Sequence, residues 1–458
     1  MLYKFSQIFG ITRNFWQSRT GNVAITFAFA TIPILGALGA AVDFSRANSV
    51  KADLQAALDS TALMLSREAS TDTNTQLQAN AQSYFTANYN RPGTSIGTIT
   101  ATYTTTGGTQ VLVNGSVNVP TDFAQVLGVY SITVTATSTV KWGMSRLRVA
   151  LVLDNTGSMA QSGKIGALQT ATTNLLSQLS SAATTNGDVY VSIVPFVNAV
   201  NLDPANYNAT WIDWTDWNAS NGTCSNSRYT TQSSCTSNHK TWTPANHNSW
   251  SGCVTDRGLP YSTGNTTPSA GNYDQTVTQP IAGNTATLFP AFQAPSCPQA
   301  AMGLSYDWSS MQSVVNNMQP GGSTDQPIGL VWGWQTLVGG GPFTAPAMDP
   351  NYTYTQVIVL LTDGLNTQDR WYGDGYSTST QVDSRMYDSS GNGTCANIKA
   401  TGIIIYTVQV NTDGSPTSTL LQNCASSSDK FFLLTSSDQI ITTFNTIGTN
   451  LTKLYVAK

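Results

Sequence analysis

The sequence predicts an α/β protein in three successive parts: a membrane-spanning helix, a small α+β domain, and a large domain built on a doubly wound parallel sheet. Three observations lead to this prediction. An uncharged apolar stretch lies near the N-terminus, helical periodicity then gives way to strand periodicity, and continuous apolar runs alternate with helical stretches after residue 146. A chain of 458 residues is long enough to form more than one core.

The N-terminal apolar stretch covers residues 23–42 and reads VAITFAFATIPILGALGAAV. Its length is about the ~20 residues that cross a bilayer as a helix. Lys4, Arg13 and Arg19 precede it, and the first acidic residue of the chain is Asp43. This asymmetry predicts a basic cytoplasmic segment and an extracytoplasmic location for everything after the helix.

We expect the basic segment at residues 1–20 and the transmembrane helix at 21–43. A cleaved secretory signal is the alternative, because small residues follow Ala37. A retained anchor is favoured, since the apolar stretch is longer than the core of a signal peptide and the chain continues as a helix.

Residues 44–142 are expected to pair a long helix with a small antiparallel sheet. Apolar residues recur at steps of three and four up to Leu65, and a second helical stretch covers 76–89. The period then changes to two. The expected strands are 96–103, 110–117 and 131–137, with a turn at Gly107–Gly108 between the first two.

Residues 146–458 are expected to form the parallel-sheet domain. Its predicted buried strands are 147–153, 189–197, 357–361 and 403–410, and its predicted helices include 164–179 and 324–337. Strand–helix alternation with fully apolar strands is typical of a parallel sheet covered on both faces. Residues 201–299 show no sustained period and are expected to be an irregular, disulfide-rich insertion.

Charge and cysteine content narrow the possible functions. Only 10% of the residues are charged and the net charge is −4, so the chain has no electrostatic footprint for nucleic acid. Six cysteines suit a disulfide framework, although six free thiols are the alternative. They allow 15 pairings that the sequence does not resolve. The six are Cys224, Cys235, Cys253, Cys297, Cys395 and Cys424.

Three polar loops lie where carboxyl ends of the predicted strands should converge, which is where ligands bind in such sheets. They are residues 154–158 (DNTGS), 321–325 (GGSTD) and 362–366 (TDGLN). Any one of them could be a helix cap or an Asx-turn. All three in this order favour a binding site.

Together these loops resemble the metal-ion-dependent adhesion site of von Willebrand factor type A domains, which has DxSxS on the first loop, Thr on the second and Asp on the third. The matching residues are Asp154, Ser158, Thr324 and Asp363, and Thr156 stands where the family usually has serine. The resemblance implies a Rossmann-like von Willebrand A fold and a bound Mg²⁺ (or Mn²⁺ or Ca²⁺). Three hydroxyls would bind the metal directly, and the two aspartates would hold bound waters.

An enzymatic alternative starts from the same first loop. Phosphoaspartate enzymes of the haloacid dehalogenase kind carry a nucleophilic Asp in a similar DxT stretch, which would make Asp154 a nucleophile. No lysine stands at the start of a strand or helix near the third loop, and ATP is absent outside the cytoplasm. Both points favour a non-enzymatic protein.

The N-terminal segment resembles the TadE/TadG-like family of tight-adherence (Flp) pilus-assembly proteins. The residues that carry the resemblance are RTGNVAI at 19–25, GAAVDF at 39–44 and LQAALDS at 54–60. The resemblance implies a pilin-like first domain and a single-pass inner-membrane protein whose other domains are periplasmic or extracellular. Pilin-like members carry Glu at the position of Thr26, so peptidase cleavage after Gly21 is not expected.

With this architecture, Cys395 and Cys424 flank one predicted strand and are expected to pair. Cys224–Cys235 and Cys253–Cys297 are then the local pairs in the insertion. The expected function is pilus assembly through other Tad or envelope proteins, with the metal completing a protein contact. The alternatives are a surface adhesin that binds a host or surface ligand through the same metal, and a purely structural, metal-free domain.

Overall fold

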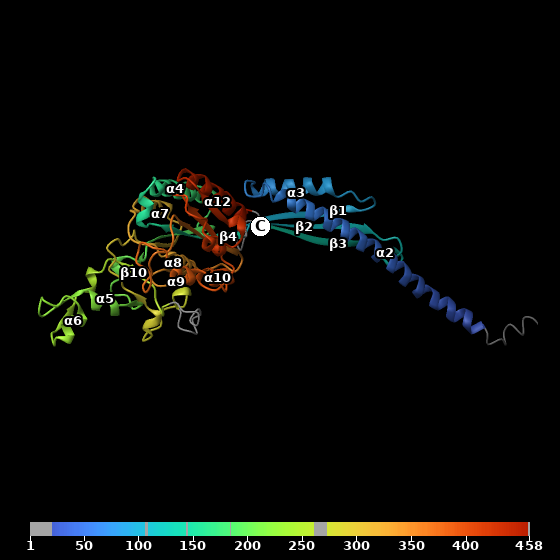
Figure 1. Ribbon diagram of the computed structural model, residues 1–458. Helices are drawn as coiled ribbons and strands as arrows, with labels where there is room; N and C mark the ends of the chain where they lie inside the picture. Colours follow the sequence, from blue (N-terminus) through green and yellow to red (C-terminus); the bar gives the residue numbers. More distant parts are fainter. Residues whose placement is uncertain (1–20, 106–108, 143–144, 184, 261–272, 457–458) are drawn as a thin grey trace, which may run out of the picture. The chain divides into compact units, whose positions relative to one another are not determined.

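The computed structural model describes residues 21–105, 109–142, 145–183, 185–260 and 273–456 (Figure 1). The chain divides into two units, Met1–Met144 and Ser145–Lys458. The predicted basic segment at 1–20 and the predicted turn at Gly107–Gly108 lie outside the described residues.

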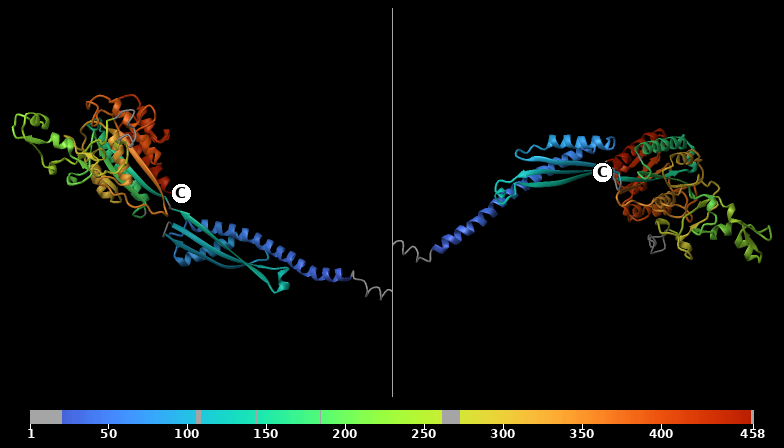
Figure 2. Two further views of the ribbon diagram at one scale, coloured as in Figure 1. Left: turned by 90° about the horizontal axis from the view of Figure 1, so that it is seen from below. Right: turned by 180° about the vertical axis from the view of Figure 1, so that it is seen from behind.

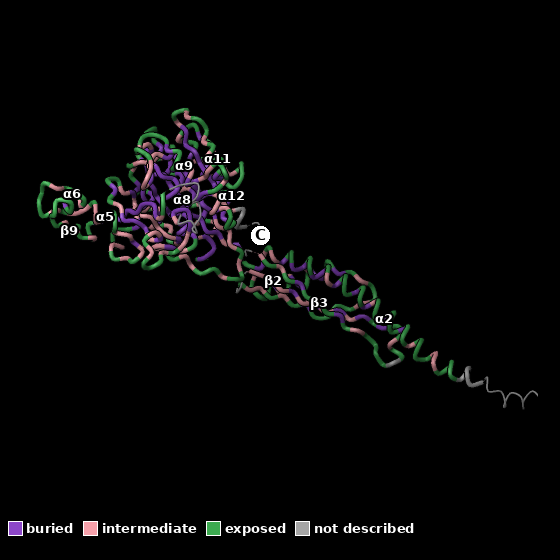
Figure 3. The backbone as a smooth tube through the Cα atoms, turned by 60° about the horizontal axis from the view of Figure 1, so that its bottom comes forward, coloured by how far each residue is buried: buried purple, intermediate pink, exposed green. Residues whose placement is uncertain are grey.

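Helix α2 (Gly21–Leu65) opens the first unit and continues through Pro33 without a break. Among the described residues it is the one helix long and apolar enough to cross a membrane, and it therefore fits a single-pass anchor. Its large apolar side chains between Phe27 and Val42 are exposed. The backbone tube of this part is mostly green, the colour of exposed residues, in Figure 3. From Ala47 onward the helix buries one side against the rest of the unit.

The second half of α2 packs, together with α3 (Asn74–Asn88), on a three-stranded antiparallel sheet (Figure 2). The strands β1 (Ser95–Thr104), β2 (Thr109–Pro120) and β3 (Ser131–Trp142) pair in that order within the described residues. The alternation predicted from the sequence puts Val111, Val113 and Val117 into one buried cluster with Leu54 and Leu58 of the helix. The expected helix-on-sheet arrangement is therefore present.

The second unit is built on five parallel strands, ordered β5-β4-β13-β14-β15. In register, Leu151 lies beside Ile193 on one side and Val359 on the other. The apolar runs are buried on both faces, as the sequence predicts for a parallel sheet. The strands are β4 (Ser145–Asp154), β5 (Val189–Phe196), β13 (Thr353–Thr362), β14 (Ile404–Val410) and β15 (Phe431–Leu434).

Short antiparallel strands extend this sheet beyond β5, to eight strands within the described residues. β6 (Val200–Asn201) and β12 (Met302–Ser305) both pair with β5, and β10 (Cys253–Val254) pairs with β6. These strands of two to four residues are too short to show a period, so the sequence does not predict them.

Helices cover both faces of the sheet. On one face lie α4 (Lys164–Ala182), α7 (Trp308–Asn316) and α12 (Asp438–Val456). The other face carries α8 (Gln326–Val338), α9 (Thr380–Met386), α10 (Thr394–Ala400) and α11 (Thr419–Cys424). Helix α8 is the most deeply buried, as its purple tube in Figure 3 shows. A Cβ added at Gly333 would lie 2.5 Å from Val152 Cγ2, so glycine permits this close approach to the sheet.

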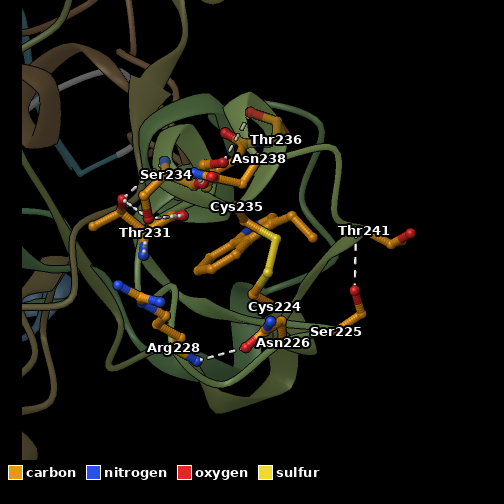
Figure 4. Close-up of a disulfide and its surroundings, with 12 residues drawn as sticks. Cys224, Ser225, Asn226, Arg228, Thr231, Ser234, Cys235, Thr236, Asn238 and Thr241 are labelled. Atoms are coloured by element: carbon orange, nitrogen blue, oxygen red, sulfur yellow. Dashed lines mark hydrogen bonds between the residues drawn. A yellow bond between two sulfur atoms is a disulfide. The ribbon is translucent and has the colours of Figure 1, made fainter.

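The stretch 201–299 contains only short elements, and residues 261–272 lie outside the described part. One lobe is closed by the disulfide Cys224–Cys235, beside which the Thr241 N–H donates to Ser225 Oγ at 3.2 Å (Figure 4). The other elements of the stretch 201–299 are β7 (Ile212–Asp213), α5 (Thr215–Ser220), β8 (Gly222–Cys224), α6 (Gln232–Ser237), β9 (Trp242–Pro244) and β11 (Phe289–Pro290). The 3₁₀ turns of the chain are η1 (Ala124–Leu127), η2 (Gly157–Ala160), η3 (Pro204–Asn206), η4 (His247–Ser249), η6 (Tyr273–Gln275), η7 (Thr285–Thr287) and η8 (Ser428–Lys430).

All six cysteines lie within the described ranges, and the structure pairs them as Cys224–Cys235, Cys253–Cys297 and Cys395–Cys424. The last bridge joins α10 to α11, the helices on either side of β14 in the sequence. Both of its cysteines are fully buried, so the bridge forms part of the core on that face of the sheet.

Candidate metal site

Two of the three polar loops follow neighbouring parallel strands, and this brings their aspartates together. Asp154 is the last residue of β4, and Asp363 comes directly after β13, which pairs with β4. The Thr362 hydroxyl donates to Asp154 Oδ2 at 2.6 Å, which ties the two strand ends to each other. The carboxyl edge of the sheet therefore presents both aspartates within one small region.

The first loop folds back over the Asp154 carboxylate. The Thr156 N–H donates to Asp154 Oδ1 at 2.8 Å, so both oxygens of this carboxylate accept hydrogen bonds. The Thr156 and Ser158 hydroxyl oxygens are 3.1 Å apart, and Ser158 Oγ donates to Asp363 Oδ1 at 2.6 Å. A chain of polar contacts therefore runs from the first loop to the third.

Backbone hydrogen bonds hold the second loop against the other two. The Gly157 N–H donates to the Gly322 carbonyl at 3.1 Å, and the Thr367 N–H donates to the Thr324 carbonyl at 2.9 Å. A Cβ added at Gly364 would lie 3.9 Å from both Ser158 Oγ and Thr324 Oγ1. The hydroxyls of the first and second loops thus face one common point beside Gly364.

That point opens into a cavity of about 670 Å³. Its wall includes Thr156, Ser158, Thr324 and Asp363, four of the five residues singled out from the sequence. Asp154 is fully buried and is not part of the wall. The structure therefore brings all five residues together and leaves one of them beneath the surface of the pocket.

Lys164 is a residue of this pocket that sequence reasoning did not place there. It is the first residue of α4, and its ammonium group forms an ion pair with Asp363 Oδ2. The expectation that no suitably placed lysine approaches the third loop is therefore wrong. This lysine is far from the third loop in the sequence and comes from the helix that follows the first loop.

Burial changes the acidity of the innermost carboxylate. Loss of solvent raises the pKa of Asp154 to about 7, and the negative charge of Asp363 adds to the effect. The hydrogen bonds from Thr156 and Thr362 act in the opposite direction. A cation in the pocket would favour the ionised form of Asp154, since an opposite charge lowers a carboxyl pKa.

A buried ionic cluster lies immediately behind the second loop. Arg385, which is 1% exposed, pairs with Asp256 and Asp369 at 2.6 Å each and with Asp274 at 2.7 Å. A fourth carboxylate, Asp325, lies 3.8 Å away and also accepts from the Ile328 N–H to cap α8. Since Asp325 directly follows Thr324, the cluster braces the residue that carries the second-loop hydroxyl.

The donor set suits a hard divalent cation. Mg²⁺ prefers about six oxygen ligands and retains several waters, and the pocket offers three hydroxyls, the Asp363 carboxylate and room for solvent. No group of three His, Cys, Asp or Glu side chains suited to a metal occurs in the described part of the chain. A metal at this place would therefore depend mainly on neutral hydroxyl oxygens.

Several contributing residues have only weak sequence signals. Thr362 is the end of an apolar strand, and its hydroxyl becomes informative only when β13 is placed beside β4. Asp256 and Asp274 come from the irregular insertion and meet Arg385 of α9. Because these contacts join segments far apart in the sequence, no local spacing could have indicated them.

A family model supports the resemblance at the N-terminus. Residues 21–64 match the model described as putative Flp pilus-assembly TadE/G-like. This covers α2 and only a small part of the chain. The sequence matches no curated protein.

Solved structures show remote similarity. The pilus adhesin SpaC from Lactobacillus rhamnosus GG is 15% identical, with 80% of this chain and 36% of that one covered and a TM-score of 0.36. The von Willebrand factor domain of the type V pili tip protein Mfa5 from Porphyromonas gingivalis is 9% identical, with 67% and 95% covered and a TM-score of 0.33. This chain spans about a third of the length of SpaC.

Proposed function

We propose that this chain is a non-enzymatic, membrane-anchored component of Tad/Flp pilus assembly that binds a protein partner through a divalent metal. Its N-terminus would be cytoplasmic and its second unit periplasmic or extracellular, with α2 as a single span of the inner membrane. The match of residues 21–64 to a pilus-assembly family model supports the proposed role in pilus assembly. The observation that carries the binding role is the convergence of hydroxyls from two loops with Asp363 on one pocket wall.

The pocket residues suggest how such a contact would work. Thr156, Ser158 and Thr324 would hold Mg²⁺ (or Mn²⁺ or Ca²⁺) through uncharged oxygens, which leaves much of the ion's positive charge available to a further ligand. A carboxylate on the partner supplies such a ligand. Asp154 would lie beneath the pocket wall, where the hydrogen bonds that it accepts from Thr156 and Thr362 hold the first loop in place.

Mn²⁺ binding to the full chain in detergent tests the site directly, because free Mn²⁺ gives an electron paramagnetic resonance signal that bound Mn²⁺ loses. We expect one saturable site, weakened at least about tenfold by Ser158→Ala, since one direct ligand is removed. Ser181→Ala, on the exposed face of α4, is the matched control and should bind as the wild type does. Equal binding by all three proteins would rule out the pocket as the site.

A pull-down with and without EDTA then tests the partner contact, which should be lost with the metal.

Exposure of the protein at the cell surface distinguishes an assembly factor from an adhesin. Protease treatment of intact cells should leave an assembly factor uncut and should cleave an adhesin that binds a host or surface ligand. Normal piliation and adhesion with Asp154→Ala would instead favour a structural domain without a metal.

The enzymatic alternative requires Asp154 to reach a phosphoryl donor. Lys164 supplies a positive charge of the kind phosphoryl transfer needs, and this observation favours the alternative. Against it, Asp154 is fully buried, accepts hydrogen bonds at both oxygens and does not line the pocket. Covalent labelling of Asp154 by a phosphate analogue would support the enzyme, and metal binding without turnover would support the binding role.

A further inference from the structure

The connection between β2 and β3 in the first unit carries an exposed apolar surface. It runs from residue 121 to 130 and includes the 3₁₀ turn η1 (Ala124–Leu127). Four of its apolar side chains are exposed: Phe123 by 53%, Val126 by 86%, Val129 by 48% and Tyr130 by 74%. Strand connections facing water are usually polar, so this composition requires an explanation.

The loop is fixed to one level of helix α2. The Asp43 carboxylate accepts hydrogen bonds from the backbone N–H groups of Asp122, Phe123 and Ala124, at 2.9, 3.0 and 2.7 Å. A Cβ added at Gly39 would lie 2.6 Å from Phe123 Cβ, so the glycine lets the loop approach the helix closely. Arg46 adds an ion pair with Asp122 at 2.9 Å.

This level coincides with the end of the apolar segment of α2. Residues 23–42 carry no charge, and the first charged residues beyond them are Asp43 and Arg46. Twenty helical residues rise about 30 Å, which matches the hydrocarbon thickness of a bilayer. If α2 spans the membrane, the loop must lie where its hydrocarbon core meets the headgroups.

We propose that residues 121–130 form an interfacial anchor, in which Phe123, Val126, Val129 and Tyr130 insert into the lipid leaflet from which α2 emerges. The proposal rests on α2 spanning the membrane. We assign lipid as the partner because the loop contacts α2 at Gly39 and Asp43, each next in the sequence to an exposed apolar residue, Leu38 and Val42, that must itself face acyl chains. Tyrosine is also enriched at this depth, where its ring is apolar and its hydroxyl reaches water.

The anchor has a structural consequence for the first unit. A helix alone leaves the sheet free to tilt about the point where the chain leaves the membrane. A second attachment through the loop fixes the orientation of β1, β2 and β3 relative to the membrane plane. The Asp43 carboxylate contributes by satisfying three loop N–H groups that water would otherwise have to reach.

Site-specific fluorescence tests the proposal, because all native cysteines are paired and an introduced one is uniquely reactive. Val126→Cys would carry an environment-sensitive dye in the full chain, reconstituted into phosphatidylcholine liposomes with nitroxide groups at a shallow or deep position. We expect a blue-shifted emission and stronger quenching by the shallow nitroxide. The matched control is Thr139→Cys, an exposed position about 26 Å along β3 from the loop, which should show neither effect.

A third label separates the proposal from its premise. Ile32→Cys lies at the middle of the apolar segment and should be quenched most by the deep nitroxide. Quenching at position 32 without quenching at 126 would overturn the anchor alone, and no quenching at 32 would overturn the premise and the proposal together. Efficient disulfide crosslinking between two unlabelled copies of the Val126→Cys variant, together with no lipid quenching of the labelled protein, would assign the loop to a protein interface instead.

Discussion

Lys164 and Asp363 form an ion pair within the pocket where the three polar loops meet. The ammonium group therefore approaches the same carboxylate that a divalent metal would use. Two cations at one carboxylate repel each other strongly in a partly buried site. We expect Lys164→Met to raise the affinity for Mg²⁺ by at least about tenfold, since two unit charges about 4 Å apart near a protein surface interact by about 4 kcal/mol.

Isothermal titration of Mg²⁺ into the full chain measures this change. Lys164→Arg keeps the charge and should stay close to the wild type. Lys430→Met removes the half-buried lysine of the Lys430–Asp429 pair, outside the pocket, and should not change Mg²⁺ affinity. Weaker Mg²⁺ binding by Lys164→Met would contradict the competition and indicate that the lysine helps to shape the site.

The raised pKa of Asp154 predicts how the metal-free protein responds to pH. Its folded-state pKa is about 7 against an ordinary value of 3.8, so the folded protein holds a proton that the unfolded chain has lost between these values. The free energy of unfolding should therefore fall as the pH rises from about 4 to about 7, by an amount on the order of a few kcal/mol.

Urea unfolding of the full chain, followed by tryptophan fluorescence in EDTA, measures this dependence. Other buried carboxylates titrate in both proteins, so the difference between wild type and Asp154→Asn isolates this residue. The variant should lose less stability over the same pH range. Mg²⁺ should restore stability at pH 8 in the wild type and not in the variant. Parallel pH curves would show that Asp154 keeps an ordinary pKa.

The cluster around Arg385 predicts a large loss of stability when its guanidinium is removed. Three different carboxylates each accept a hydrogen bond of 2.6 to 2.8 Å from this side chain, and all of these groups are buried. Arg385→Met should lower the free energy of unfolding by about 3–5 kcal/mol, because the remaining charges would be buried without a partner.

Arg385→Lys should not restore the stability, since an ammonium group cannot reproduce the planar set of donors. The exposed Arg228 is the control, and Arg228→Met should change stability by less than about 0.5 kcal/mol. Chemical unfolding of the three variants gives the comparison. If Arg385→Met had nearly the wild-type free energy of unfolding, the carboxylates would have to be protonated together and would need no cation.

The disulfides are expected to differ in what they stabilise. Cys395–Cys424 closes a separation of 29 residues within the core, and its replacement by two alanines should lower the free energy of global unfolding by about 3–4 kcal/mol. Cys224–Cys235 closes a separation of 11 residues in a peripheral lobe. Its loss should mainly accelerate proteolysis between β8 and β9 and leave the global midpoint nearly unchanged. Equal effects on the midpoint would show that the lobe unfolds together with the sheet.

Much of the second unit follows from local sequence features, and its ionic contacts do not. The apolar runs that became β4 and β13 could be recognised because strands buried on both faces lack alternation. Each run ends in a polar loop, so Asp154 and Asp363 could be assigned to the same edge. The ion pair of Lys164 with Asp363 could not be predicted, because it depends on the direction of α4. The ion pairs of Arg385 could not be predicted either, because they depend on the path of the irregular insertion.

The methyl group of Thr156 is the departure from the usual motif, and the local geometry predicts that it is tolerated. The Thr156 N–H binds Asp154, and its hydroxyl oxygen lies 3.1 Å from Ser158 Oγ, so the hydroxyl already points toward the other donors. Thr156→Ser should therefore bind Mn²⁺ within about threefold of the wild type. Thr156→Val keeps the shape and removes the oxygen, and should weaken binding at least about tenfold. Titration followed by electron paramagnetic resonance compares the two. Wild-type affinity in Thr156→Val would exclude this hydroxyl as a ligand, and much tighter binding by Thr156→Ser would show that the methyl group hinders the metal.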